Sequence, residues 1–158
     1  VPAAERAREI AWLAQRGEPA FRAGQILAWI YRHGADGFAA MTNLPLGLRA
    51  ALEAAFAFPR LEPTRVSRSA DGTRKLLFEL GGGDAIESVL IPDPPRLTLC
   101  ISSQAGCAMD CAFCATARLG LGRNLSATEI AGQVLAATRE LGDGERITNL
   151  VFMGMGEP

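Results

Sequence analysis

Three of the four cysteines of this chain lie close enough in sequence to bind one metal centre together. Cys107, Cys111 and Cys114 follow the spacing C-x3-C-x2-C, and the aromatic Phe113 precedes the last of them. Closely spaced thiolates are ligands for zinc and for iron–sulfur clusters. Because no secretory signal is visible, this pattern favours metal binding over disulfide bonds.

The number of available ligands helps to distinguish these two metals. A structural zinc site is closed by four protein ligands, and the candidates for a fourth ligand are Cys100 and His33, the single histidine. Neither lies in a second C-x2-C or H-x3-H half-site. A cluster held by three cysteines leaves one iron open for a small molecule. We therefore favour an iron–sulfur cluster, with a zinc site and unliganded buried thiols as the alternatives.

The charge of the chain does not indicate a globally basic protein. The formal net charge is −1 over 158 residues, but the stretch 60–75 is locally basic. Such a stretch is either the solvated face of a β-hairpin or a surface that contacts an RNA backbone. Its basic residues are Arg60, Arg65, Arg68, Arg74 and Lys75, against Glu62 and Asp71. No apolar run is long enough for a membrane span, and we expect a reducing cytoplasmic location.

The first 95 residues predict two kinds of structure. Apolar spacing indicates helices over residues 3–16 and 22–33, and a third helix that starts at Pro45 and ends before Pro59. We therefore predict a helical domain over residues 1–58. Residues 59–95 predict a β-hairpin around Asp71-Gly72 and a further strand, followed by a linker or boundary at Pro92–Pro95.

Residues 96–158 predict the beginning of a parallel sheet. Leu97–Ser102 and Asn149–Met153 are short apolar runs typical of buried parallel strands. Between them, Ser126–Glu129 forms a capping box that begins a helix. This order makes one βαβ unit and an α/β fold. The stretch Ser103–Leu125 has no regular period, and so long a loop is usually functional.

Beyond the cysteines, the sequence resembles the RlmN/Cfr family of radical S-adenosylmethionine (SAM) methyltransferases. The similarity covers nearly everything from Ala20 onward and is greatest to the RlmN branch, which methylates C2 of an adenine in 23S rRNA and in certain tRNAs. It is carried by the cysteine motif, Glu87–Pro92, Leu99–Cys107, Arg123–Leu125, Glu129–Val134 and Asn149–Pro158, and by the segments around Phe21–Ala23 and Met41-Thr42. The implied fold is an N-terminal helical and β-hairpin accessory domain followed at 96–158 by the start of a truncated (βα) radical SAM barrel.

The resemblance implies roles for seven residues. Cys107, Cys111 and Cys114 would hold a [4Fe–4S] cluster whose open iron binds SAM. The turn at Gly156 and Glu157 would contact the SAM molecule. Glu87 corresponds to the proton acceptor, and Cys100 to a cysteine that can pair transiently with the methyl-carrying cysteine. Considered without the resemblance, Glu87 is a solvent-facing strand residue, Cys100 a small buried apolar residue, and Gly156-Glu157-Pro158 a strand-ending turn.

The resemblance also implies partners and an incomplete chain. The substrates would be 23S rRNA and tRNA, the electron donor a protein such as flavodoxin, and the enzyme a monomer. No cysteine follows Cys114, so the methyl-carrying cysteine is expected beyond residue 158. We therefore expect this chain to be a fragment that does not complete methyl transfer. The alternatives are a Cfr-like adenine C8 methyltransferase and a zinc-stabilised RNA-binding module.

Overall fold

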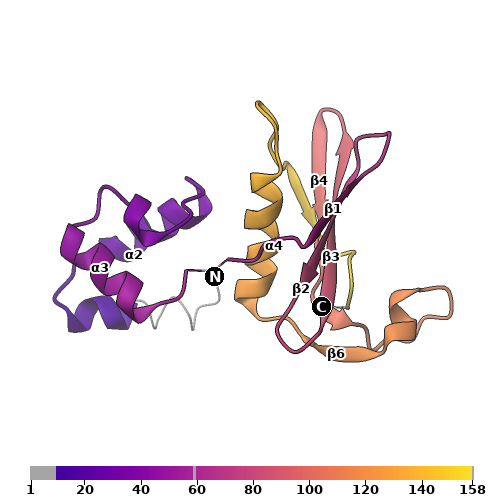
Figure 1. Cartoon of the computed structure of the whole chain (residues 1–158), viewed down its shortest axis with the longest axis horizontal. Helices are drawn as coiled ribbons and strands as arrows, with labels where there is room; N and C mark the ends of the chain where they lie inside the picture. The colour runs from indigo at the N-terminus through magenta and orange to yellow at the C-terminus, as the bar shows by residue number, and fades with distance from the viewer. Residues whose placement is uncertain (1–9, 59, 158) are drawn as a thin grey trace. The chain divides into compact units, whose positions relative to one another are not determined.

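The protein consists of two compact units. The computed structural model describes residues 10–58 and 60–157, and the units comprise residues 1–60 and 61–158 (Figure 1). The first unit is helical and the second contains the strands and one long helix. This content confirms the predicted α/β class, with a helical part preceding the sheet. None of the helices in the described ranges is long and apolar enough to cross a membrane.

The helical unit contains short helices close to the ranges that the sequence predicts, although α2 and α3 end a few residues earlier than expected. Residues 10–15 are helical, and the predicted part of this helix before residue 10 lies outside the described residues. Gly17, at φ +70°, ends the helix, and the Glu18 N–H donates to the Leu13 carbonyl in a Schellman arrangement. The remaining elements are α2 (Phe21–Tyr31), the 3₁₀ turn η1 (Phe38–Ala40) and α3 (Leu46–Ala55).

Apolar side chains from each of these elements form the core of the helical unit. Met41 and Leu13 are the most completely buried of them, and Pro45 precedes α3 as its N-cap residue. Tyr31, at the end of α2, is exposed. The buried residues are Leu13, Ala23, Ile26, Ile30, Ala35, Phe38, Met41, Leu44, Leu48 and Leu52.

The second unit is organised around a five-stranded sheet with the order β1-β2-β3-β4-β7. The first four strands form an antiparallel meander: β1 (Arg65–Arg68), β2 (Arg74–Glu79), β3 (Ala85–Asp93) and β4 (Arg96–Cys100). The last strand, β7 (Asn149–Val151), pairs in parallel with β4. Helix α4 (Ala127–Arg139) connects these two strands, so the predicted βαβ unit is confirmed.

Helix α4 covers one face of the sheet and packs against its apolar side chains. Alternate residues of β2, β3 and β4 point toward α4, and they form an apolar core with Ala136 and Ala137 of the helix. The side chains from the strands are Leu76, Phe78, Ile86, Leu90, Leu97 and Leu99. Because side chains alternate along a strand, the residues between them point to the opposite face. Glu87 and Cys100 belong to that second set.

The proline-rich stretch Pro92–Pro95 has a different role from the linker that the sequence predicts. Strand β3 continues to Asp93, and β4 starts at Arg96, which pairs with Asp93 in the ladder and by its guanidinium. Only Pro94 and Pro95 connect the two strands. At the tip of a hairpin these residues give up no ladder hydrogen bond, so proline is tolerated there. Residues 61–95 therefore share one sheet with the strands that follow.

Two short strands that the sequence does not indicate form the base of the cysteine loop. Strand β5 (Gln104–Gly106) pairs antiparallel with β6 (Leu121–Asn124), and the turn η2 (Thr116–Leu119) lies between them. The loop projects from the sheet beyond β6 (Figure 1). Strands of three and four residues are too short to show a period of two, and their pairing joins residues far apart in sequence.

Candidate active site

The cysteine loop is closed at its base by tight backbone contacts. The N–H of Cys107 donates to the Gly120 carbonyl at 3.0 Å. Gly106, at φ +78°, lies so close to this carbonyl that an added Cβ would be 1.8 Å from the Gly120 oxygen. Only glycine combines this dihedral with this approach. The residue before the first cysteine therefore fixes the start of the loop.

The three cysteines of the loop are partly exposed free thiols. Backbone N–H groups of Ala117 and Thr116 lower the pKa of the Cys114 thiol, since hydrogen bonds stabilise its thiolate form. The Met109 N–H lies 3.5 Å from the Cys107 sulfur and donates to it. Thiolates are the metal-binding form of cysteine, so the donor chemistry of the loop suits an iron–sulfur cluster.

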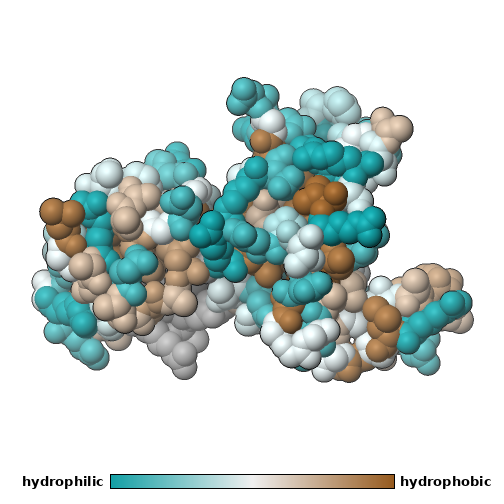
Figure 2. All heavy atoms as spheres, in the orientation of Figure 1, coloured by the Kyte–Doolittle hydropathy of each residue, from teal (hydrophilic) through white to brown (hydrophobic). Residues whose placement is uncertain are grey.

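The structure does not gather these thiols into a ligand set. Across residues 10–58 and 60–157, no group of three His, Cys, Asp or Glu side chains could hold a metal ion. The loop also exposes large apolar side chains, seen as brown and tan atoms on the projecting segment in Figure 2. These are Met109, Phe113, Leu119 and Leu121, of which Phe113 is 94% exposed. The loop thus carries three thiols that this structure does not bring together as ligands.

Glu87 lies on β3, on the sheet face opposite α4. Its carboxylate forms an ion pair with Lys75 of β2, with the Lys75 Nζ and Glu87 Oε1 atoms 2.9 Å apart. Both side chains are about half exposed, and a pair of this kind contributes roughly 0–1 kcal/mol to stability. The contact holds the carboxylate on this face without burying it.

Cys100 lies on the same face of the sheet as Glu87. It pairs with Val89, two residues beyond Glu87 on the neighbouring strand, so the two Cα atoms are diagonal neighbours at about 7–8 Å. Burial raises the pKa of the Cys100 thiol, with a smaller opposing effect of the Met153 N–H. A buried, protonated thiol is a poor nucleophile. The register of β3 and β4 therefore brings together two candidates that are distant in sequence.

The turn at Gly156 and Glu157 packs against the end of β4 and the start of β5. The Glu157 N–H donates to the Gln104 side-chain oxygen, and both Ser103 and Gln104 donate to the Met155 carbonyl. Gly156 has φ +98°, and an added Cβ would be 2.6 Å from the Cβ of Gln104. Since Cys107 follows Gln104 by three residues, the turn and the cysteine loop begin at the same end of β4.

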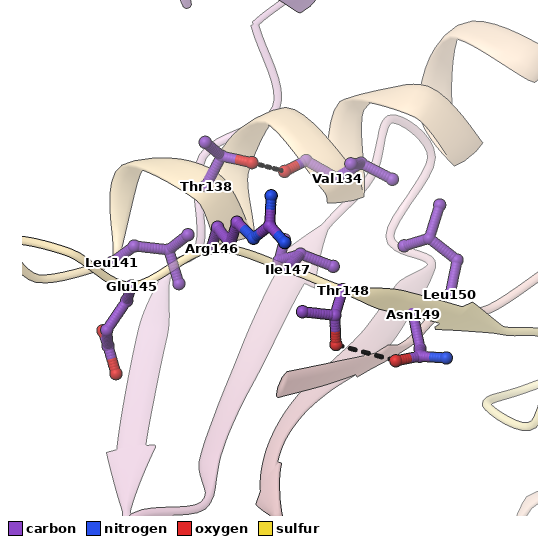
Figure 3. A pocket seen from close by; sticks show the side chains of 9 residues that line it. All are labelled: Val134, Thr138, Leu141, Glu145, Arg146, Ile147, Thr148, Asn149 and Leu150. Atoms are coloured by element: carbon purple, nitrogen blue, oxygen red, sulfur yellow. Dashed lines mark hydrogen bonds between the residues drawn. The ribbon is translucent and has the colours of Figure 1, made fainter. Parts of the chain in front are cut away.

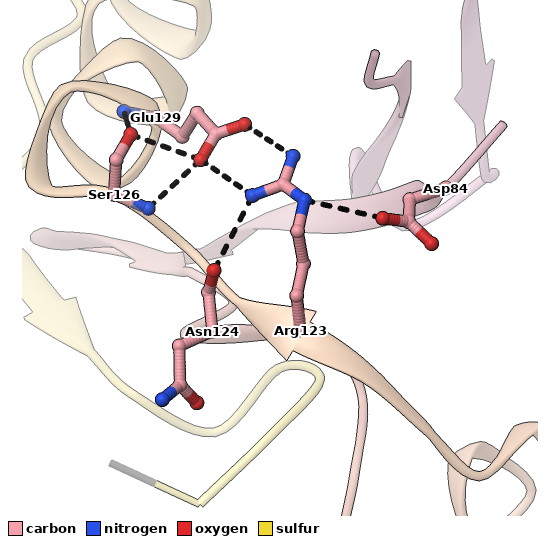
Figure 4. Close-up of polar contacts among 5 residues, drawn as sticks. All are labelled: Asp84, Arg123, Asn124, Ser126 and Glu129. Atoms are coloured by element: carbon pink, nitrogen blue, oxygen red, sulfur yellow. Dashed lines mark hydrogen bonds and ion pairs between the residues drawn. The ribbon is translucent and has the colours of Figure 1, made fainter. Parts of the chain in front are cut away.

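A cluster of charges around Arg123 connects the cysteine loop to the sheet (Figure 4). Arg123 of β6 donates to both carboxylate oxygens of Glu129, at 2.6 and 2.9 Å, and to Asp84 in the β2–β3 turn at 3.2 Å. Glu129 also completes the predicted capping box with Ser126. The capping box was visible in the sequence, but the bonds to Arg123 and Asp84 were not.

The charge cluster is expected to make the stability of the fold pH-dependent. The Arg123 hydrogen bonds, aided by the N–H and hydroxyl of Ser126, lower the pKa of Glu129 from 4.5 to about 2. This stabilisation is present above pH 4.5 and is lost as the pH falls toward 2. In Glu129→Gln, the decrease in urea midpoint between pH 5 and pH 2.5 should become smaller. Arg123→Met should flatten the profile similarly, and an unchanged profile in both variants would contradict the assignment.

The basic stretch 60–75 is largely neutralised within the fold. Arg74 is buried and donates to both oxygens of Glu145 and to the Glu140 carbonyl. Arg68 pairs with the Glu140 carboxylate, and Lys75 pairs with Glu87. These acidic partners lie 12 to 72 residues away in sequence. Paired charges of this kind stabilise the fold and present a weaker positive surface than the sequence suggests.

An open hollow of about 420 Å³ lies between α4 and the segment that leads into β7 (Figure 3). Its wall includes Val134, Leu141, Ile147 and Leu150. Helix α4 runs antiparallel to β7, so the hollow extends along the C-terminal half of the helix. The cysteine loop meets the N-terminal end of the same helix. The hollow is therefore separate from the candidate active site.

Comparison with known proteins identifies the relatives of this chain. Residues 5–57 match the family model described as the ribosomal RNA large subunit methyltransferase N-terminal domain. The chain is 50% identical to the dual-specificity RNA methyltransferase RlmN of Desulfosudis oleivorans, over 97% of this chain and 41% of that protein. It is 52% identical to RlmN of Pelobacter propionicus, over 93% of this chain and 41% of that protein.

A solved structure shows the same fold. The crystal structure of a radical SAM methyltransferase from Sphaerobacter thermophilus superposes with a TM-score of 0.86 at 46% identity. The superposition covers 97% of this chain and 46% of that protein. The fold of this chain is therefore the fold of the corresponding part of that radical SAM methyltransferase. The chain is similar to RlmN proteins over the part that it spans, about two fifths of the length of the curated relatives it matches.

Proposed function

We propose that this chain contributes the cluster-binding loop and the proton-accepting strand of an enzyme that methylates adenine C2 in 23S rRNA and tRNA. The observation that carries the proposal is the convergence at β4. Glu87 and Cys100 share one face of the sheet, while the cysteine loop and the Gly156-Glu157 turn begin where β4 ends. Chemistry at the carboxyl ends of parallel strands is typical of α/β enzymes.

In this proposal, Cys107, Cys111 and Cys114 hold a [4Fe–4S] cluster. When bound, such a cluster supplies the electron for reductive cleavage of S-adenosylmethionine. The N–H groups of Ala117 and Thr116 stabilise the thiolate form of Cys114, and the Met109 N–H donates to the Cys107 sulfur. Gly156 has no Cβ, so the turn packs closely against Gln104. For the same reason, its backbone would allow the SAM molecule to approach closely. The Glu157 carboxylate accepts hydrogen bonds from the SAM ammonium group.

Glu87 and Cys100 act on the substrate side of the sheet. Carbon added at adenine C2 leaves a proton that must be removed, and the Glu87 carboxylate accepts it. Lys75 holds one oxygen of this carboxylate at 2.9 Å and orients it on the open face. Cys100 is buried and protonated on the same face of the sheet. It serves as the transient disulfide partner of a methyl-carrying cysteine. Electrons come from a donor protein such as flavodoxin, and the enzyme acts as a cytoplasmic monomer.

The proposal is tested by anaerobic reconstitution of the chain with iron and sulfide. Iron and acid-labile sulfide should be retained, and the reduced protein should give an electron paramagnetic resonance signal that changes when SAM is added. Zinc uptake without sulfide, in a chain shown by circular dichroism to be folded, would instead support the zinc-stabilised RNA-binding module. Analysis of the RNA product separates C2 from C8 methylation in an enzyme that carries this chain.

A further inference from the structure

The buried side chain of Gln133 holds the chain immediately after β4. Its Nε2 donates to the Ser102 carbonyl at 2.9 Å, and its Oε1 accepts from the Ser102 N–H at 2.8 Å. The same Oε1 accepts from the Ser88 hydroxyl at 2.7 Å. Gln133 is 0% exposed, and a buried amide is stable only when its hydrogen bonds are made. The Gln133 amide on helix α4 therefore satisfies both main-chain groups of Ser102, as a neighbouring strand would.

The Ser102 side chain extends this network to the two halves of the candidate site. Its hydroxyl donates to the main-chain carbonyl of Glu87 at 2.6 Å. The same oxygen accepts from the Met155 N–H at 2.9 Å. Ser102 is 0% exposed, so these bonds form away from water. One buried hydroxyl thus joins the strand that carries Glu87 to the turn that carries Gly156 and Glu157.

The packing around this hydroxyl leaves it little freedom. An added Cβ at Gly154 would lie 2.7 Å from the Ser102 Oγ and 2.7 Å from the Ile101 carbonyl. The Gly154 N–H donates to that carbonyl at 3.1 Å. Since the turn presses directly on Ser102, removal of the hydroxyl leaves the Met155 N–H without its acceptor in a confined space.

We propose that Ser102, held by Gln133, is a positioning residue that fixes the Met155–Glu157 turn relative to Glu87. This inference rests on the proposed function, which gives the Met155–Glu157 turn its role in SAM binding and Glu87 its role as proton acceptor. In this assignment, the hydrogen bonds of a buried serine set the distance between the SAM-contacting turn and the strand that carries the proton acceptor. Ser102 touches neither the substrate nor the cluster in this assignment, and it acts through the backbone of Glu87 and Met155.

A matched pair of variants separates positioning from general stability. Ser102→Ala removes the bonds to Glu87 and Met155, whereas Ser88→Ala removes another buried hydroxyl bonded to the same Gln133. Amide hydrogen exchange of the 158-residue chain is followed by nuclear magnetic resonance. Exchange at Met155 should become at least tenfold faster in Ser102→Ala and should stay unchanged in Ser88→Ala.

Equal exchange at Met155 in Ser102→Ala and the unaltered chain would overturn the inference, as would equal acceleration by Ser88→Ala. If Ser102→Ala does not fold, a measurement on the unaltered chain still tests the inference. A nuclear Overhauser contact between the Ser102 hydroxyl proton and the Met155 amide proton supports the inference, and its absence overturns it.

A second measurement distinguishes this inference from the proposed function. SAM binding to the reconstituted chain is measured by equilibrium dialysis, and Ser102→Ala should bind at least tenfold more weakly than Ser88→Ala. Equal binding by both variants overturns the positioning role and leaves the proposed function intact. Failure of the unaltered chain to bind SAM counts against the proposed function, and the exchange at Met155 then decides whether Ser102 positions the turn.

Discussion

Replacing Cys111 with alanine is expected to reduce iron binding to background. In Cys111→Ala, a cluster held by three thiolates would lose one of its three protein ligands. The protein binds the metal through these ligands, so the affinity should fall sharply. The loop should keep its shape, because the Cys111 carbonyl rather than its sulfur accepts from the Cys114 N–H at 3.0 Å. Iron and sulfide analysis after anaerobic reconstitution measures the loss, and circular dichroism shows whether the fold is kept.

Cys100→Ala is the matched control for this experiment. Cys100 is buried in the sheet and is not needed as a ligand in a three-cysteine site. Its replacement should cost about 1 kcal/mol in stability, as for other small losses of buried volume, while iron binding remains. Loss of metal in both variants would show that four thiolates are required and would favour the zinc interpretation. Retention of iron in Cys111→Ala would exclude this residue from the cluster.

Replacing Gly106 with alanine is expected to be the most destabilising single change at the cysteine loop. The new Cβ would be 1.8 Å from the Gly120 carbonyl oxygen, so the backbones of β5 and β6 must separate. The hydrogen bond from the Cys107 N–H to that carbonyl is then lost. Left-handed strain and overpacking together should cost roughly 2–5 kcal/mol. Urea unfolding measures the cost, and cross-strand contacts of the β5–β6 pair report the separation.

Gly144→Ala provides the control for backbone strain alone. Gly144 has φ +79°, nearly the same as the +78° of Gly106, but an added Cβ there meets nothing within 4 Å. Its replacement should cost about 1–2 kcal/mol. A similar loss in both variants would show that the approach to Gly120 contributes nothing. A larger loss in Gly106→Ala, together with weaker iron retention, would show that this approach sets the start of the loop.

The elements that the sequence predicts best are those defined by neighbouring residues. The Asp71-Gly72 turn forms, with Gly72 at φ +84° and the Asp71 carboxylate accepting from the Thr73 N–H. The Ser126–Glu129 capping box begins α4. In each case the stabilising contacts join residues at most three positions apart. Such contacts form in the same way whatever the rest of the chain does, so local patterns are sufficient to predict them.

Strand ends and the pairing of charges were less predictable. The Pro92–Pro95 stretch looks like a boundary because proline interrupts strands. In the structure, however, Pro92 lies within β3, and Pro94 and Pro95 form the tip of the β3–β4 hairpin. The basic stretch looks like an open surface because its partners are distant. Glu140 and Glu145 reach it only after α4 has folded onto the sheet. Their positions depend on the strand register, which no local pattern specifies.

By itself, the sequence determined the chemical groups of the candidate site: three thiols in a fixed order, one carboxylate on a strand, and a glycine–glutamate turn. Only the tertiary structure decided which of these groups meet. The β3–β4 register places Glu87 and Cys100 on one face, and the Ser102 hydroxyl joins Glu87 to Met155, which lies 53 residues from Ser102. The physical reason is that one residue of register shift would turn every side chain of a strand to the other face. That register is fixed by the packing of the whole core against α4.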